Sequence, residues 1–321
     1  MSARPAVLLT RGLPEKATRI LADSTHLTVN LHDRAMSRDE LVAALPDKTG
    51  LLSLVTDTVD AELLDLAPDL KVISNYAVGY DNIDVKAATE RGIIVTNTPD
   101  VLTAATADLA FALLLAAARR VVEGDRMVRA GRWTGWEPMQ LLGAEVTGSS
   151  LGLVGLGRIG RAVIPRAQGF GMNVSYWNRT RLSEAEEKRL RINYLGLDEL
   201  LATSRFVSLH VAGTQETRRL IDRRALHLMR NDAYLINTAR GTVVDEVALV
   251  DALREGRIAG AGLDVYEREP ELAVGLAGLA NVVLAPHLGS ATVSTRTEMA
   301  LLAVGNLLAV LEGDEPAHRV N

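Results

Sequence analysis

A glycine-rich turn between an apolar strand and a helix constrains the fold of this chain more than any other feature. Leu151–Val154 is a short apolar run, and Gly155, Gly157 and Gly160 follow it with the spacing G-x-G-x-x-G before a helix-like segment. The first glycine permits the tight turn, the second lets backbone approach a phosphate, and the third lets the helix pack on the strand. The pattern predicts that a dinucleotide pyrophosphate binds at the start of this helix.

A second strand, Met172–Trp177, ends where such a domain carries the residue that binds the adenosine ribose, about 20 residues after the turn. An acidic residue there would bind the two free ribose hydroxyls of NAD. This chain has Asn178, Arg179, Thr180 and Arg181 instead. The cationic side chains predict a preference for NADP(H), with NAD(H) left open as an alternative.

Composition excludes several other classes of protein. The formal net charge of −5 provides no basic excess for nucleic acid or an anionic membrane surface. The chain has no cysteine, and its six histidines show no metal-ligand spacing, so no metal site is expected. The apolar run near the N-terminus is too short for a signal peptide, and Leu109–Ala118 is shorter than the roughly 20 residues of a membrane span. We therefore expect a cytoplasmic protein.

Strand-like and helix-like segments alternate along the chain, which is typical of parallel sheets. The predicted fold class is α/β, with two doubly wound parallel-sheet domains: a Rossmann cofactor domain and a smaller, flavodoxin-like substrate domain. Long helices are predicted at 104–122 and 292–311. The predicted strands are 6–10, 50–55, 71–74 and 93–96 in the first set, and 151–155, 172–177, 206–211, 233–237, 258–264 and 281–284 in the second.

The last helix determines the predicted domain division. If it returns to the N-terminal set, the substrate domain is discontinuous and comprises 1–99 and 288–321, with the Rossmann domain at 100–287. A cleft between two such domains is the natural place for a site.

Three polar residues each follow an apolar strand of the second set, at the carboxyl edge where open α/β sheets bind ligands. Arg240 offers a forked, permanently charged donor for a carboxylate or carbonyl. His287, if Glu269 lies beside it, would be oriented and favoured in its protonated form, so that it could donate a proton near neutral pH. Taken singly, an arginine or glutamate in a loop is more often a solvated surface residue.

A second motif can be rejected. Gly148–Gly152 matches the G-x-S-x-G pattern of serine hydrolases, but in those enzymes a strand precedes the serine and a helix follows it. Here Ser150 precedes a strand, so a serine nucleophile is not expected.

Together the motifs strongly resemble the D-isomer-specific 2-hydroxyacid dehydrogenases over essentially the whole chain. Within that family the chain is most similar to the glyoxylate and hydroxypyruvate reductases. The motifs that carry the resemblance are 153–160, 237–241, 260–270 and 285–291 for the family, and 76–84, 96–103 and 131–136 for the subgroup.

The resemblance implies hydride transfer between a nicotinamide and a small 2-oxo or 2-hydroxy acid, with His287 as general acid and base, Glu269 as its partner and Arg240 on the substrate. Backbone N–H groups of Val78 and Gly79 would bind the substrate carboxylate. The implied cofactor-binding residues are Thr106, Gly155, Leu156, Gly157, Arg158, Ile159, Gly160, Asn178, Arg179, Thr180, Thr238, Ala239, Arg240, Asp264, His287 and Gly289.

The resemblance also implies a homodimer, in which Trp136 either enters the partner's substrate site or is an interface aromatic. Two other functions stay open at this point. One is a D-2-hydroxyacid dehydrogenase for a larger 2-oxo acid. The other is a nucleotide-sensing binding protein, similar to the corepressors that share this fold, against which the set of Arg240, Glu269 and His287 argues. A formate dehydrogenase is not expected, because its relatives carry Gln where Glu269 stands.

Overall fold

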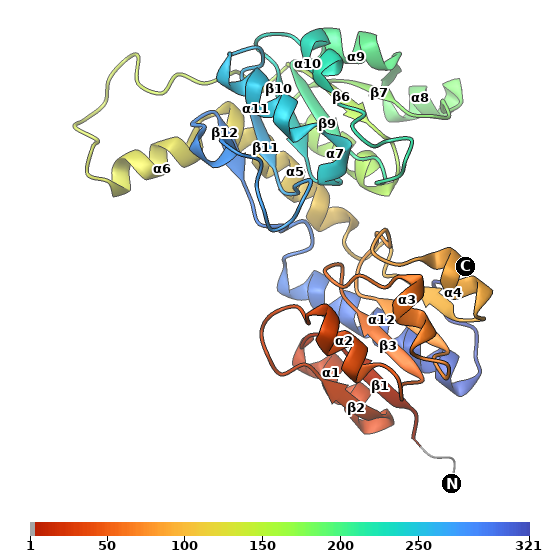
Figure 1. Cartoon of the computed structure of the whole chain (residues 1–321). Coiled ribbons are helices and arrows are strands. Elements are labelled where there is room, and N and C mark those ends of the chain that lie inside the picture. Colours follow the sequence, from red (N-terminus) through yellow and green to blue (C-terminus); the bar gives the residue numbers. More distant parts are fainter. Residues whose placement is uncertain (1–3) are drawn as a thin grey trace. The chain divides into compact units, whose positions relative to one another are not determined.

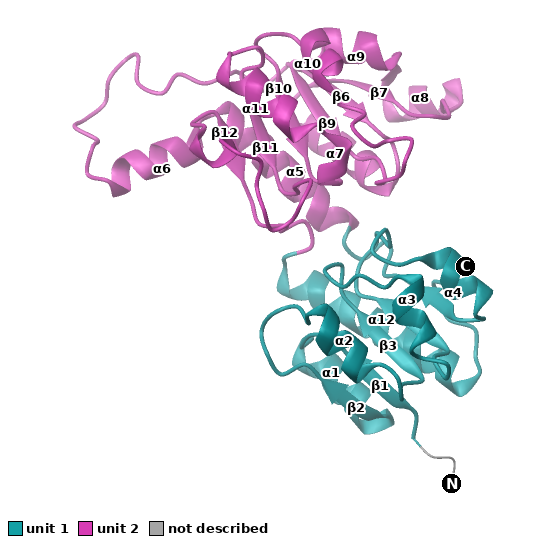
Figure 2. Cartoon of the chain, viewed as in Figure 1, with its two compact units in different colours: residues 1–102, 291–321 teal, residues 103–290 magenta. Residues whose placement is uncertain are grey.

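The computed structural model describes residues 4–321, which form two compact units (Figures 1 and 2). Unit 1 ends at Leu102 and resumes with Ala291–Asn321, and unit 2 is the intervening Thr103–Ser290. The first three residues of the predicted substrate domain lie outside the described residues. Each unit has its own sheet with helices on both faces, and the predicted α/β class with two parallel-sheet domains is confirmed.

Unit 1 is built on a parallel five-stranded sheet with the order β2-β1-β3-β4-β5. This is the flavodoxin-like order, and it reverses between β1 and β3. The near-continuous apolar character of β1, β3 and β4 reflects burial on both faces. The strands are β1 (Ala6–Leu9), β2 (His26–Val29), β3 (Gly50–Ser53), β4 (Val72–Asn75) and β5 (Ile94–Thr96).

The last helix of the chain packs on this first sheet. Ala300, Ala303 and Leu307 of this helix, α12 (Val293–Glu312), share a buried cluster with Val7 and Leu9 of β1. Helix α1 (Glu15–Ser24) lies on the same face, and the opposite face is covered by α2 (Arg38–Ala44), α3 (Ala61–Asp65) and α4 (Val85–Glu90).

Unit 2 is built on a parallel seven-stranded sheet with the order β12-β11-β10-β9-β6-β7-β8. Its six strands from β8 to β11 follow the Rossmann order 3-2-1-4-5-6, which reverses between β6 and β9. The strands are β6 (Ser150–Val154), β7 (Asn173–Trp177), β8 (Asn193–Tyr194), β9 (Phe206–Leu209), β10 (Tyr234–Asn237), β11 (Gly260–Leu263) and β12 (Val282–Leu284).

Two helices cover one face of this sheet and three cover the other. Helices α5 (Thr103–Ala118) and α7 (Arg158–Gly169) share one buried cluster, and α9 (Leu197–Thr203), α10 (Arg223–Leu228) and α11 (Glu246–Arg254) share the other. The remaining elements are α6 (Val121–Arg129), α8 (Glu184–Leu190) and the short 3-10 helices Gly241–Val243 and Leu276–Gly278.

The structure corrects two features of the predicted elements. The predicted helix 104–122 is two helices, because Arg120 adopts a left-handed φ of 53° and the Ala118 carbonyl accepts the Ala144 N–H at 2.8 Å. The second strand set has seven members instead of six. The edge strands β2 and β8 were missed, because β2 is half exposed and contains polar residues and β8 has only two residues.

Candidate active site

The glycine turn joins β6 to α7 and leaves room for a ligand at one of its three glycines. Gly155 has a φ of 94°, and a Cβ there would lie 2.6 Å from the His210 carbonyl oxygen. A Cβ on Gly160 would lie 2.5 Å from the Gly155 carbonyl oxygen. Nothing lies within 4 Å of the place that a Gly157 Cβ would occupy, so a phosphate can approach the backbone there.

The start of α7 provides hydrogen-bond donors for an anion. The helix begins at Arg158, followed by Ile159, and the N-cap residue Gly157 gives it no side-chain cap. The first N–H groups of a helix have no acceptor within the helix and carry partial positive charge. The turn and the helix start therefore fit the pyrophosphate of a dinucleotide.

Asn178, directly after β7, connects this turn to the loop that follows β7. Its Oδ1 accepts a hydrogen bond from the Leu156 N–H at 3.3 Å, and its Nδ2 donates to the Thr180 carbonyl at 3.0 Å. The side chain thereby couples the position of the Arg179–Thr180 segment to the glycine turn.

Arg181 forms an ion pair within the protein, which leaves Arg179 as the other arginine of the predicted cationic segment. Its guanidinium donates to both oxygens of the buried Glu187 carboxylate at 2.9 Å, and the Tyr176 hydroxyl donates to the same carboxylate at 2.7 Å. These hydrogen bonds, from Arg181 and Tyr176 in that order, outweigh desolvation and lower the pKa of Glu187 to about 2. Leu182 N–H donates to the Tyr176 hydroxyl at 2.9 Å, so the network fixes the loop around Arg179.

Glu269 and His287 form a hydrogen-bonded pair with 2.8 Å between Oε2 and Nδ1. The other carboxylate oxygen of Glu269 accepts the Tyr266 N–H at 3.1 Å. Burial acts to raise the pKa of Glu269, but the hydrogen bond and charge of His287, the Tyr266 N–H and the charge of Arg240 together lower it. The carboxylate is therefore ionised at neutral pH and holds Nδ1 of the imidazole, which leaves Nε2 for other partners.

The backbone of His287 is held in an unusual conformation. Its φ of 55° lies in the left-handed region, and its N–H donates to the Asp264 carbonyl at 3.0 Å. The Asp264 carboxylate accepts the N–H groups of Leu288 at 2.6 Å and Gly289 at 2.8 Å. Burial raises the pKa of Asp264, which is 1% exposed. A strained residue, fixed by the Asp264 carbonyl at its own N–H and by the buried Asp264 carboxylate at the next two residues, is typical of a functional site.

Arg240 follows β10 and lies close enough to Glu269 for its positive charge to help lower the pKa of that carboxyl group. The Asn237 Nδ2 donates to the Arg240 carbonyl at 2.9 Å, and Nη1 of Arg240 donates to the Ala239 carbonyl at 2.9 Å. At Gly241, a Cβ would overlap the Tyr266 carbonyl group. Glycine there lets the turn of Arg240 approach the loop that carries Glu269. The three residues predicted from separate strands thus meet at one edge of the second sheet.

The other predicted cofactor residues of unit 2 lie at the same edge. Thr106 of α5 donates from its hydroxyl to the Gly289 carbonyl at 3.0 Å. Thr238 and Ala239 follow β10 directly, and the Thr238 side chain is buried.

The remaining predicted site residues are Val78 and Gly79, in the loop after β4 of unit 1, and Trp136. Trp136 lies in the segment after α6, and 82% of it is exposed. In Figure 1, α6 and this segment extend from the rest of unit 2.

Sequence reasoning missed three residues near these groups. Asn237 ends the strand that precedes Arg240, so its place was visible. Glu187 had no signal, because Glu184 and Glu186 precede it on the same short helix. His210 lies under the glycine turn, and burial lowers its pKa to about 4, so its ring is neutral.

Among residues 4–321, no three side chains of the metal-binding types His, Cys, Asp and Glu are grouped to hold an ion. Within that same part of the chain, no helix has the length and apolar character needed to cross a membrane.

A Rossmann-ordered sheet, a glycine turn that admits a pyrophosphate, and a carboxylate–imidazole pair beside an arginine at the carboxyl edge define a nicotinamide-dependent dehydrogenase. This is the class of protein that the fold and site describe.

Comparison with known proteins identifies the family. Residues 111–289 match the model of the D-isomer specific 2-hydroxyacid dehydrogenase NAD binding domain. The chain is 51% identical to a glyoxylate reductase of Thermococcus litoralis, covering 99% of this chain and 97% of that protein. Its structure is similar to the TT0316 protein of Thermus thermophilus, with TM-score 0.91, 50% identity, and 98% of this chain and 100% of that chain covered.

A third relative is an NADPH-dependent glyoxylate/hydroxypyruvate reductase of Sinorhizobium meliloti, solved with NADP and malonate. It has a TM-score of 0.87 and 35% identity, with 99% of this chain and 97% of that chain covered. The chain belongs to the D-isomer-specific 2-hydroxyacid dehydrogenase family and is an NAD(P)-dependent oxidoreductase, which confirms the predicted family and enzyme class.

Proposed function

We propose that this protein is an NADPH-preferring reductase of small 2-oxo acids, which converts glyoxylate to glycolate and hydroxypyruvate to D-glycerate. The observation that carries the proposal is the 2.8 Å contact between Glu269 Oε2 and His287 Nδ1 at the edge where Arg240 also lies. The identity of about half the chain to glyoxylate reductases, and the NADPH-dependent reductase among the similar structures, support the substrate class.

In this proposal the protein supplies the proton and holds the substrate. When bound, the reduced nicotinamide provides the hydride that reduces the carbonyl carbon. Glu269 accepts the Nδ1–H of the imidazolium, so Nε2 carries the proton that passes to the carbonyl oxygen as that oxygen gains charge. Arg240 binds the carboxylate and polarises the carbonyl. After the transfer His287 is neutral, and it takes up a proton from solvent before the next turnover.

In this proposal the two predicted domains bind different ligands. Residues 100–287 bind the cofactor, and residues 1–99 with 288–321 bind the substrate. The open backbone at Gly157 and the start of α7 would hold the pyrophosphate, and Asp264 and Thr106 fix the 287–289 loop. The two Asp264 oxygens retain lone pairs beyond their backbone hydrogen bonds, so Asp264 is proposed to bind the nicotinamide carboxamide as well.

We base the preference for NADPH on the residues after β7. No acidic residue stands at the end of that strand, where a carboxylate would repel a 2′-phosphate. Arg181 is paired with Glu187, so the proposed phosphate ligands are Arg179 and Thr180, and NAD(H) remains a weaker cofactor.

We propose that the partner is a second copy of this chain, bound through α6 and the segment after it. Helix α6 has no buried residue. The segment exposes Trp133, Trp136, Met139 and Leu142, each by more than half. Apolar exposure on this scale is typical of a surface that is covered by a partner.

A steady-state comparison of substrates tests the proposed function. The ratio kcat/KM is measured for glyoxylate, hydroxypyruvate, pyruvate and a larger 2-oxo acid with NADPH and with NADH, by the loss of reduced nicotinamide. We expect glyoxylate and hydroxypyruvate with NADPH to give the highest values. A maximum with a larger 2-oxo acid would overturn the substrate, and no turnover with any 2-oxo acid would overturn the function.

A further inference from the structure

The loop after β4 has its carbonyl groups bound by the rest of unit 1. Four successive residues, Ala77 to Tyr80, each use their carbonyl oxygen as a hydrogen-bond acceptor. The donors are the Thr98 N–H to Ala77 at 2.9 Å, Asn97 Nδ2 to Val78 at 2.8 Å, Asn75 Nδ2 to Gly79 at 2.9 Å and the Ile83 N–H to Tyr80 at 3.0 Å.

The N–H groups of the same loop behave differently. Within the described residues, the Val78 and Gly79 N–H groups donate to no protein acceptor, in contrast to their carbonyls. The peptide bonds that contain them are trans, since the single cis bond in the described chain precedes Pro270. In a planar trans peptide, the C=O and the following N–H point in opposite directions.

Each of these two N–H groups is therefore oriented by the group that binds the carbonyl of the same peptide bond. Binding the Ala77 carbonyl orients the N–H of Val78, and binding the Val78 carbonyl orients the N–H of Gly79. The first carbonyl is held by the Thr98 backbone, and the second by a side chain, the amide of Asn97. Asn97 is therefore the side chain that fixes the Val78–Gly79 peptide plane.

Asn97 is itself fixed from two sides. Its N–H donates to the His318 carbonyl at 3.3 Å, and its carbonyl accepts from Nδ2 of Asn306 at 3.2 Å. Asn306 belongs to α12 and is 2% exposed. The backbone of Asn97 is thus held by His318 and by Asn306 of α12. The side-chain amide of Asn97 is a neutral donor, so it polarises the Val78–Gly79 peptide without adding a charge beside it.

We propose that Asn97 is a positioning residue for recognition of the substrate carboxylate. It holds the Val78–Gly79 peptide so that successive N–H groups point together at one anion, the arrangement of a backbone anion site. The inference rests on the proposed function, and it adds to it a side chain that acts through the backbone without touching the substrate.

Two variants of Asn97 and a substrate analogue test the proposal. Asn97→Ala removes the donor, and Asn97→Leu removes it while keeping a neutral side chain of similar volume, which separates the hydrogen bond from packing. The probe is oxalate, titrated into the complex of the protein with NADPH. We expect the KM for glyoxylate and the Kd for oxalate to rise about tenfold in both variants, the equivalent of one ordinary hydrogen bond.

The expected pattern distinguishes positioning from general damage. Because carboxylate binding is shared by ground state and transition state, kcat should change far less than the KM for glyoxylate. The KM for NADPH should stay at the wild-type value, and thermal unfolding of Asn97→Leu should resemble that of the wild type.

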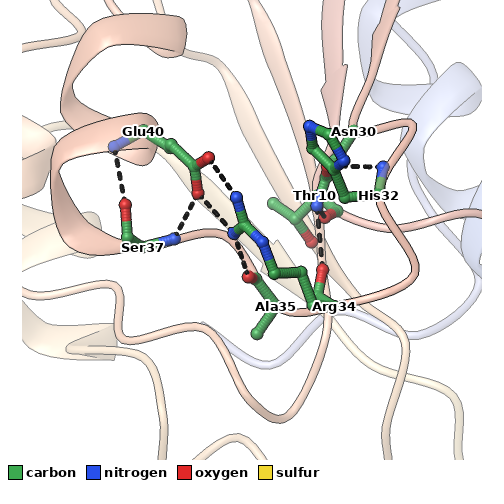
Figure 3. A network of polar contacts seen from close by, with 7 residues as sticks. All are labelled: Thr10, Asn30, His32, Arg34, Ala35, Ser37 and Glu40. Carbon is green, nitrogen blue, oxygen red and sulfur yellow. Dashed lines mark hydrogen bonds and ion pairs between the residues drawn. The ribbon is translucent and has the colours of Figure 1, made fainter.

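Asn30 provides a matched control in the same unit (Figure 3). Its Nδ2 also donates to two loop carbonyls, those of Thr10 at 3.0 Å and Arg34 at 2.9 Å. The loops that contain Thr10 and Arg34 carry none of the predicted site residues, so Asn30→Ala should leave the KM for glyoxylate and the Kd for oxalate unchanged.

Unchanged glyoxylate and oxalate constants in Asn97→Leu would overturn the inference, as would an equal rise in the KM for NADPH. If the wild-type protein reduces no small 2-oxo acid but still binds oxalate with a dependence on Asn97, the proposed function fails while the anion site stands.

Discussion

At the scale of single residues, the pair of Glu269 and His287 is the basis of the proposed function. Its two members lie 18 positions apart in the sequence, and each follows a different strand. Sequence reasoning identified both because a polar residue after an apolar strand is conspicuous. The left-handed backbone of His287 and the supporting carboxylate of Asp264 could not be predicted, since they depend on how two loops pack.

The pair leads to a prediction about pH. The lowered pKa of Glu269 keeps its carboxylate ionised over the working range, so the carboxylate can hold Nδ1 of His287 throughout that range. Glu269→Gln keeps a hydrogen-bond acceptor but removes the charge. We expect kcat/KM for reduction to fall about 10²-fold. The wild type should lose activity at acid pH as Glu269 becomes protonated, below the usual range of a glutamic acid, and this loss should be absent from the variant.

The pH profile of kcat/KM for glyoxylate, measured with saturating NADPH, checks this expectation. Glu271→Gln, two residues further on and exposed, is the matched control and should follow the wild-type profile. A Glu269→Gln profile that has the wild-type shape at every pH would show that the carboxylate charge has no part in the proton transfer.

At the scale of elements, the alternation of strands and helices was predictable, but the anchoring of loops was not. Buried central strands such as β6 and β9 are visible as apolar runs, whereas β2 and β8 at the sheet edges carry polar residues. The break after α5 depends on a contact of Ala118 with Ala144, which no local pattern encodes.

The loop after β7 provides the prediction at this scale. Glu187 binds Arg181 and Tyr176, and Tyr176 binds the Leu182 N–H, so the carboxylate stabilises the loop that carries Arg179. Glu187→Gln weakens this anchor. We expect the ratio of kcat/KM with NADPH to that with NADH to fall about tenfold, because a charge-assisted hydrogen bond is lost.

Steady-state kinetics with both cofactors measures this ratio. Arg179→Ala should reduce it further, since it removes the proposed phosphate ligand, and Glu184→Gln, an exposed change on the same helix, should leave it at the wild-type value. If Arg179→Ala and Glu187→Gln both retain the wild-type ratio, the loop does not select the cofactor.

At the scale of the whole molecule, the return of α12 to the first sheet makes unit 1 discontinuous. The sequence indicated this possibility through the apolar last helix, but only the buried cluster of α12 with β1 shows it. The segment after α6 is the opposite case, because the exposure of its large apolar side chains was not evident from periodicity.

The exposed segment predicts an association in solution. Sedimentation equilibrium should give twice the chain mass of 34.5 kDa. Leu142→Glu, which places a charge in the proposed interface, should shift the protein toward the monomer. Val274→Glu changes an apolar residue of the same unit that is 96% exposed, and should leave the mass unchanged. A monomeric wild-type protein at all concentrations would contradict the dimer.

The central claim is that His287 delivers the proton while the hydride reduces a small 2-oxo acid. The most direct measurement compares wild type with His287→Asn for glyoxylate reduction by NADPH, together with the Kd for NADPH of each. We predict that kcat falls by about 10² to 10⁴-fold in the variant while the Kd for NADPH stays the same. Glyoxylate reduction by His287→Asn at the wild-type rate would contradict it.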